Sequence, residues 1–143
     1  MKNFKELRIW QNALNLYEAI LPFAKKAKAE GFYKLCNQVE GASGSILDNI
    51  AEGMHRGGNP EFIQFLYISK GSCAELESQL YRLNKAKIIP DEELQTHTQK
   101  TEQLRAEIQA LINYIRKSNY SGEKKIYQNR TPNSEPRTLN PEH

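Results

Sequence analysis

The sequence lacks features that mark several classes of protein. Only two cysteines, Cys36 and Cys73, occur among its 143 residues, and they form neither a CxxC pair nor a zinc-ligand pattern. Two isolated cysteines of this kind usually behave as small apolar side chains in a reducing compartment. Their number and spacing exclude a disulfide framework. No apolar run approaches membrane-spanning length, and the opening "MKNFKELRIW" has no secretion signal. These absences predict a cytoplasmic protein with no membrane partner.

A strong excess of one charge is also absent. Twenty Lys and Arg face 17 Asp and Glu, so the net charge of +3 only weakly indicates anionic partners. The length suits one domain. No alternating strand pattern appears, which argues against a sheet-based fold.

What the sequence does contain is four segments with apolar residues at helical spacing. The first begins at Phe4, and Pro22 should kink or break it before Gly31 ends it. The second begins near Leu35 and should end at Gly53.

The loop "MHRGGNP" should follow, with Asn59 capping a third helix that fades at "KIIP". The fourth helix should begin at Asp91. Its seam starts with polar residues, among them His97, so we expect its first turns to be loosely held and His97 to be partly exposed.

Short connections between amphipathic helices predict an all-α fold. We expect an up-down-up-down antiparallel four-helix bundle over residues 1–118. Residues 119–143 are rich in Asn, Pro and charge and have no apolar period, so they should form a disordered polar tail.

Polar residues interrupt the second and third segments and form the first candidate site. Asn49 and Glu52 lie three residues apart and share a helix face, and Arg56 and Glu75 are near enough to join them. This set indicates a polar joint between helices or a subunit contact. A solvated face and a ligand site are the alternatives.

Catalytic and metal-binding patterns are weak. Glu52 and His55 have the Glu-x-x-His spacing of di-iron bundles, but no second such pair exists and His55 should lie at a helix end. No Ser-His-Asp or Cys-His arrangement follows from the spacing. The sequence predicts no enzymatic activity, no metal and no cofactor.

Basic residues gather where three helices should meet one pole of the bundle. Cations at helix C-termini complement the helix dipole, but a basic pole can also bind phosphate backbones of RNA or DNA weakly. Both explanations stay open for this candidate nucleic-acid-binding set, which consists of Lys25, Lys26, Lys28, Lys34, Arg82, Lys85 and Lys87.

A second apolar stripe lies off the main helix seams. An exposed patch of this kind predicts a partner surface, although some members could simply widen the core. The stripe consists of Ile9, Leu16, Ile63, Tyr67, Ile68 and Ile112.

Three stretches of the chain and one arginine resemble a bacterial family. They are "FKELRIWQNALNL" at residue 4, "SILDNIAEG" at 45, Arg56, and "EFIQFLYISKGSCAELESQL" at 61. These motifs are similar to those of the 23S rRNA intervening-sequence proteins. The resemblance implies a four-helix bundle that assembles as a homopentamer. The family is related to the accessory protein of diversity-generating retroelements, which is thought to bind nucleic acid.

Together, these features predict a non-enzymatic, self-associating binding or scaffold protein. The alternative is a weak nucleic-acid-binding accessory protein that uses the basic residues.

Overall fold

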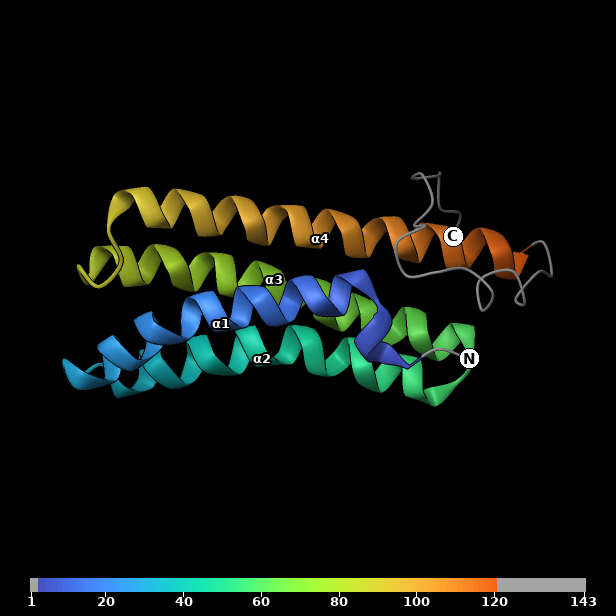
Figure 1. Ribbon diagram of the computed structural model, residues 1–143, viewed down its shortest axis with the longest axis horizontal. Coiled ribbons are helices and arrows are strands. Elements are labelled where there is room, and N and C mark those ends of the chain that lie inside the picture. The colour runs from blue at the N-terminus through green and yellow to red at the C-terminus, as the bar shows by residue number, and fades with distance from the viewer. Residues whose placement is uncertain (1–2, 121–143) are drawn as a thin grey trace.

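The computed structural model describes residues 3–120. A short 3-10 helix, η1 (Phe4–Glu6), precedes α1 (Arg8–Ala29), α2 (Tyr33–Arg56), α3 (Asn59–Lys85) and α4 (Asp91–Tyr120). The four long helices run alternately up and down beside one another (Figure 1). This arrangement confirms the predicted antiparallel bundle. The predicted tail lies outside the described residues, except that α4 continues to Tyr120, two residues past the expected boundary.

Glycines in the left-handed conformation end the first two long helices. Gly31 has φ of +91° just after α1, as predicted. The predicted end of α2 at Gly53 is wrong, because the helix continues to Arg56 and Gly57 then adopts φ of +85°. This conformation costs glycine little and other residues more. Only Gly57 and Gly58 separate α2 from α3.

Gly53 has a packing role instead of a terminating one. It is buried, and a Cβ atom placed on it would lie 2.7 Å from Cβ of Phe65 and 3.1 Å from Cδ1 of Phe62. Only a residue without a side chain therefore allows α2 and α3 to approach this closely.

Two other predicted boundaries also differ. Helix α1 runs through Pro22 without a break, with that residue on its exposed side. Asn59 is the first residue of α3, and Gly58 occupies the cap position. Pro60 follows in the first turn, where its missing N–H costs nothing.

The core is an aliphatic seam contributed by all four helices. Its fully buried members include Ile20 of α1, Ile46 of α2, Leu76 of α3 and Ile108 of α4. Ile9, Leu16 and Ile112 of the predicted second stripe also lie in this core, because their stripe widens the seam. Ile63 is half-buried, whereas Tyr67 and Ile68 of that stripe are exposed.

The start of α4 is packed more tightly than its polar sequence indicated. His97 is only 7 % exposed and Thr101 is fully buried, so the expectation of a partly exposed histidine is wrong. The Thr101 hydroxyl donates to the His97 carbonyl at 2.7 Å, which satisfies it without solvent. Polar residues can thus line the seam when backbone carbonyls of their own helix accept their hydrogen bonds.

Candidate functional site

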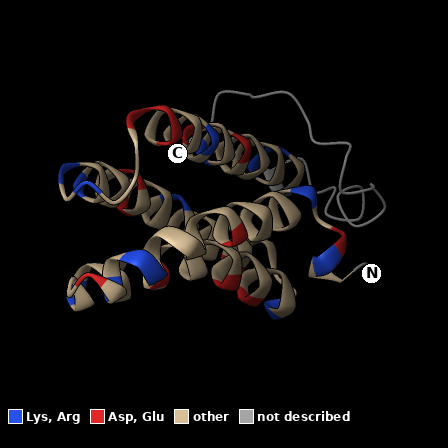
Figure 2. Ribbon diagram, turned by 60° about the vertical axis from the view of Figure 1, so that its left-hand side comes forward, with Lys and Arg blue, Asp and Glu red and all other residues tan. Residues whose placement is uncertain are grey.

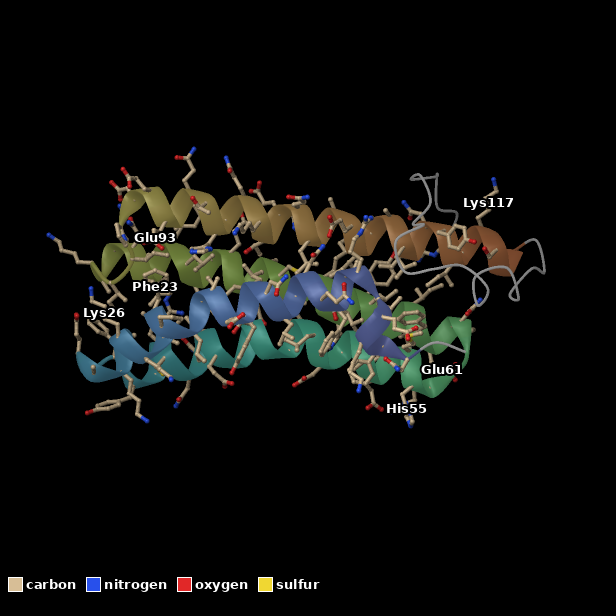
Figure 3. The ribbon with its side chains drawn as sticks, in the orientation of Figure 1. Phe23, Lys26, His55, Glu61, Glu93 and Lys117 are labelled. Atoms are coloured by element: carbon tan, nitrogen blue, oxygen red, sulfur yellow. The ribbon has the colours of Figure 1, made fainter. Side chains whose placement is uncertain are left out.

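The predicted basic residues do lie together at one end of the bundle. α1 and α3 end there and α2 begins there, and the seven side chains of this basic pole are exposed. Figure 2 shows the blue segments at that end, beside the red first turn of α4. Lys26 and Glu93 mark it in Figure 3, with His55, Glu61 and Lys117 at the opposite end.

The charges of the basic pole are only partly balanced. Exposed carboxylates at the same end come from Glu30 and from the three acidic residues that open α4. Arg82 donates to Oε1 of Gln38 at 2.9 Å, which fixes one cation against α2. Seven cations against four carboxylates leave a net positive surface that can contact phosphates.

The predicted polar joint does not form within the chain. Nε of Arg56 donates to Oε2 of Glu52 at 2.8 Å, one turn away on the same helix, and both side chains are about half exposed. The Arg56 guanidinium also lies 5.0 Å from the ring centroid of Phe65. Glu75 is exposed and makes no hydrogen bond or ion pair with any described residue. Within one chain Glu75 therefore does not join the Glu52–Arg56 pair, and a polar joint or subunit contact of these residues stays a prediction.

Serine hydroxyls make the polar contacts that do join α2 to α3. Ser72 donates to the Ser45 hydroxyl at 2.9 Å, and Ser69 donates to the Ile46 carbonyl at 2.8 Å. Asn49 belongs to this group, because its amide donates to the Ser45 carbonyl and hydroxyl at 2.8 and 2.9 Å. The cluster of small residues in "GASGS" was the signal for this close, hydroxyl-linked contact.

An aromatic side chain with two cations lies where α3 meets α4. Tyr67 is 39 % exposed, and its ring centroid lies 5.3 Å from the Arg116 guanidinium and 5.5 Å from Nζ of Lys70. The Lys70 ammonium donates to Gln109 of α4, which holds it at this edge. Tyrosine and arginine are both enriched at protein interfaces.

The buried thiol and its neighbours do not form a nucleophilic site. Burial raises the pKa of Cys73 to about 12, so the thiol stays protonated. Nearby, burial and a hydrogen bond with the Glu102 carboxyl raise the pKa of Glu77. The Arg105 guanidinium, 4.0 Å from the Glu77 carboxylate, partly offsets this rise. No ionised nucleophile results from this group.

A groove of about 250 Å³ with a mixed polar and apolar lining opens between α1 and α4. The Asn12 amide donates to Oε1 of Glu107 at 3.0 Å across it. Leu16, Ala19 and Leu104 are the apolar part of its lining. Asn12 and Glu107 therefore satisfy each other within a groove that Lys100 and Gln103 also line.

Two further properties concern the part of the chain that the structure describes. Over residues 3–120, no three His, Cys, Asp or Glu side chains gather in a way that could hold a metal ion. None of the helices in this range combines the length and the apolarity that crossing a membrane requires.

Comparison with known proteins agrees with the fold. The family model described as 23S rRNA-intervening sequence protein matches residues 5–110. A comparison with curated proteins gave no match. Because the matched range spans more than half of the chain, this four-helix protein belongs to the family of 23S rRNA-intervening sequence proteins.

Proposed function

We propose that this protein is a non-enzymatic, cytosolic four-helix bundle that associates with copies of itself and acts as a binding or scaffold module. The observation that carries the proposal is the exposed apolar surface of α3. Tyr67, Ile68 and Tyr81 are 39, 49 and 51 % exposed on this one helix. Apolar area left in water costs about 25 cal/mol per Å², so such a surface favours a partner.

The chemistry of the remaining groups supports a binding role. The Cys73 thiol is held protonated, and His55 is exposed at the end of α2. Cys36 and Cys73 are both free, which suits a reducing compartment. Self-association uses surface complementarity and needs none of the activated groups that catalysis requires.

The direct test is the molar mass of the purified protein in solution. Light scattering over a dilution series should give a multiple of 16.5 kDa, and the family resemblance implies five copies. A monomeric mass at micromolar concentration would reject self-association. A mass of two copies would keep self-association and reject the pentamer.

A second candidate function is weak binding of RNA or DNA by the basic pole. Its support is the net positive surface where α1 and α3 end, together with a family name that refers to an intervening sequence of 23S rRNA. Binding of this kind is electrostatic and falls steeply with salt. Fluorescence anisotropy with labelled RNA and DNA at low and near-physiological salt separates it from a pure scaffold, which should bind neither.

A further inference from the structure

Two aromatic rings are exposed on the connection between α1 and α2. Phe32 is 41 % exposed, and Tyr33 is 63 % exposed, more than any other large apolar side chain of residues 3–120. Both belong to the stretch "KKAKAEGFYK", which carries four lysines and one glutamate. This connection lies at the same end of the bundle as the end of α3 (Figure 1). The two rings therefore lie among cations of the basic pole.

The backbone of Phe32 is fixed from both sides. Its amide donates to the Ala27 carbonyl at 2.8 Å, and the Gly31 amide donates to the Lys28 carbonyl at 3.0 Å. With Gly31 left-handed, these two bonds close the end of α1. The Phe32 carbonyl in turn accepts from the Cys36 amide at 3.0 Å, where α2 begins. The connection thus presents both rings on an ordered backbone, so little chain entropy is lost when they bind a ligand.

The faces of both rings are free within the described chain. Neither Phe32 nor Tyr33 has a ring contact or a cation over its face among residues 3–120, and the Tyr33 hydroxyl makes no hydrogen bond there. Tyr67 differs, because Lys70 and Arg116 lie over its ring. Open aromatic faces among cations are the combination that binds unpaired bases. Any base can stack on such a ring while the cations contact phosphates.

Two cations of the basic pole are not explained by the helix dipoles. Lys34 lies in the first turn of α2, which has no acidic residue and no side-chain cap, and the positive end of a helix disfavours a cation. Lys87 follows α3 with φ of +63°, a left-handed conformation that residues other than glycine rarely adopt. Arg82 contacts Gln38, one turn after Lys34, so α3 adds a cation beside the same surface. A polyanion bound at this end accounts for these placements.

We propose that the basic pole binds single-stranded nucleic acid, with unpaired bases stacked on Phe32 and Tyr33. Phosphates of the same strand contact Lys28, Lys34 and Arg82. The inference rests on the second candidate function and names the form of nucleic acid that the pole selects. In a duplex the base faces are already stacked, so an aromatic side chain on an exposed connection meets only phosphates and groove edges. Charge alone favours the duplex, because it carries two phosphates where a single strand carries one. A preference for the single strand therefore comes from the rings.

The first test uses the wild-type protein and compares one strand in its unpaired and paired forms. A fluorescein-labelled oligothymidylate of about 16 nucleotides should bind roughly tenfold tighter alone than when annealed to oligodeoxyadenylate, measured by anisotropy at low salt. Oligouridylate, alone and annealed to oligoadenylate, repeats the comparison for RNA. The order of affinity between the two single strands tells whether DNA or RNA is the better ligand.

Substitution of the rings provides the second test. Phe32→Leu combined with Tyr33→Leu keeps apolar bulk but removes both rings, and it should weaken single-strand binding by roughly tenfold or more. The matched control is Phe32→Tyr combined with Tyr33→Phe, which keeps two rings and should bind like the wild type. Both variants should keep the slope of log affinity against log salt, because no cation is lost. Lys28→Gln combined with Lys34→Gln should instead make that slope shallower by roughly 0.7 for each lost phosphate contact.

The outcomes separate this inference from the proposed function. A wild-type protein that binds no nucleic acid at low salt would reject both. Equal or tighter binding of the duplex, or undiminished single-strand binding by the Phe32→Leu, Tyr33→Leu variant, would reject only the stacking and leave an electrostatic contact. A changed molar mass of that variant in light scattering would also overturn the inference, because the rings would then lie in a subunit contact.

Discussion

The imidazole of His97 on α4 packs edge-on against the phenyl ring of Phe23 on α1, with the ring centroids 5.9 Å apart. Nδ1 of His97 is buried with no hydrogen-bond partner among the described residues. Nε2 lies 3.6 Å from the Glu93 carboxylate. A titratable ring thus forms part of the contact between the first and last helices.

The first prediction is a pH dependence of stability that comes from His97. Burial lowers its pKa from the ordinary 6.5, Lys100 adds to the effect and Glu93 opposes it. The unfolded state therefore takes up the proton first, so stability should fall as the pH drops below about 6.5 and stop falling below the folded pKa.

Melting temperatures from about pH 8 to about pH 5 should show this loss in the wild type. The change His97→Gln removes the titrating group, so its profile should be flatter over the same range. Carboxylates contribute equally to both proteins, which makes the difference between the two profiles the informative quantity. Parallel profiles would show that His97 takes no part.

The second prediction concerns the close approach at Gly53. Gly53→Ala should destabilise the fold by about 1–3 kcal/mol, because the new Cβ would meet Phe65 at 2.7 Å and push α3 away from α2. Gly44→Ala is the matched control, since its Cβ would meet only Tyr17 at 3.8 Å. That control should be neutral or stabilising by up to about 1 kcal/mol. Equal urea midpoints for the two variants would contradict the packing role of Gly53.

The third prediction concerns the contribution of Glu52 to stability. Its ion pair with Arg56 is half exposed, and surface pairs of this spacing contribute about 0.3–0.5 kcal/mol. Glu52→Ala should therefore lower the melting temperature only slightly. Sedimentation of the same variant provides the second measurement, because a smaller assembly would mean that Glu52 lies in a subunit contact.

The fourth prediction distinguishes the two thiols. Cys36 is half-buried and Cys73 is fully buried with a pKa raised to about 12. A colorimetric thiol reagent should modify Cys36 readily in the folded protein and reach Cys73 only after denaturation. Cys36→Ser should abolish the fast phase. Rapid labelling of that variant would show that α3 and α4 separate locally.

The fifth prediction concerns nucleic-acid binding by the basic pole. Changing Lys25, Lys26, Arg82 and Lys85 together to Gln should abolish salt-dependent binding without unfolding, because all four side chains are exposed. The lost dipole contributions are about 0.3–1 kcal/mol each. Anisotropy titrations at low salt are the measurement. Undiminished binding by the quadruple variant would place the contact elsewhere, and absent binding by the wild type would reject this function.

Much of the fold follows from local sequence patterns, as the basic pole illustrates. Apolar spacing defined the four helices, and alternating direction then brought Lys26 and Arg82 to one end. Helix ends were harder to predict, because either Gly53 or Gly57 could end α2. Apolar spacing favours Gly53, and only the packing of Gly53 against Phe65 shows that the helix continues to Arg56.

The candidate polar contacts could be predicted less well. The sequence showed that Asn49, Glu52 and Glu75 interrupt apolar faces, but an exposed intrahelical ion pair and a buried joint leave the same pattern. Ser45 and Ser72 are the residues that join the helices, and only the run of small residues that ends at Ser45 indicated a close contact there. His97 was similarly ambiguous, since its burial depends on the aromatic ring that α1 places opposite.

The two-residue link between α2 and α3 has a consequence for how the chain folds. Gly57 and Gly58 bring "GASGS" and its partner serines together across a short stretch of chain, so this hairpin closes at little entropic cost. Contacts of this local kind are typical of fast-folding helical proteins. The contact of α1 with α4 must instead enclose α2, α3 and the connections between them. We expect the central hairpin to form early and the His97–Phe23 contact to close last.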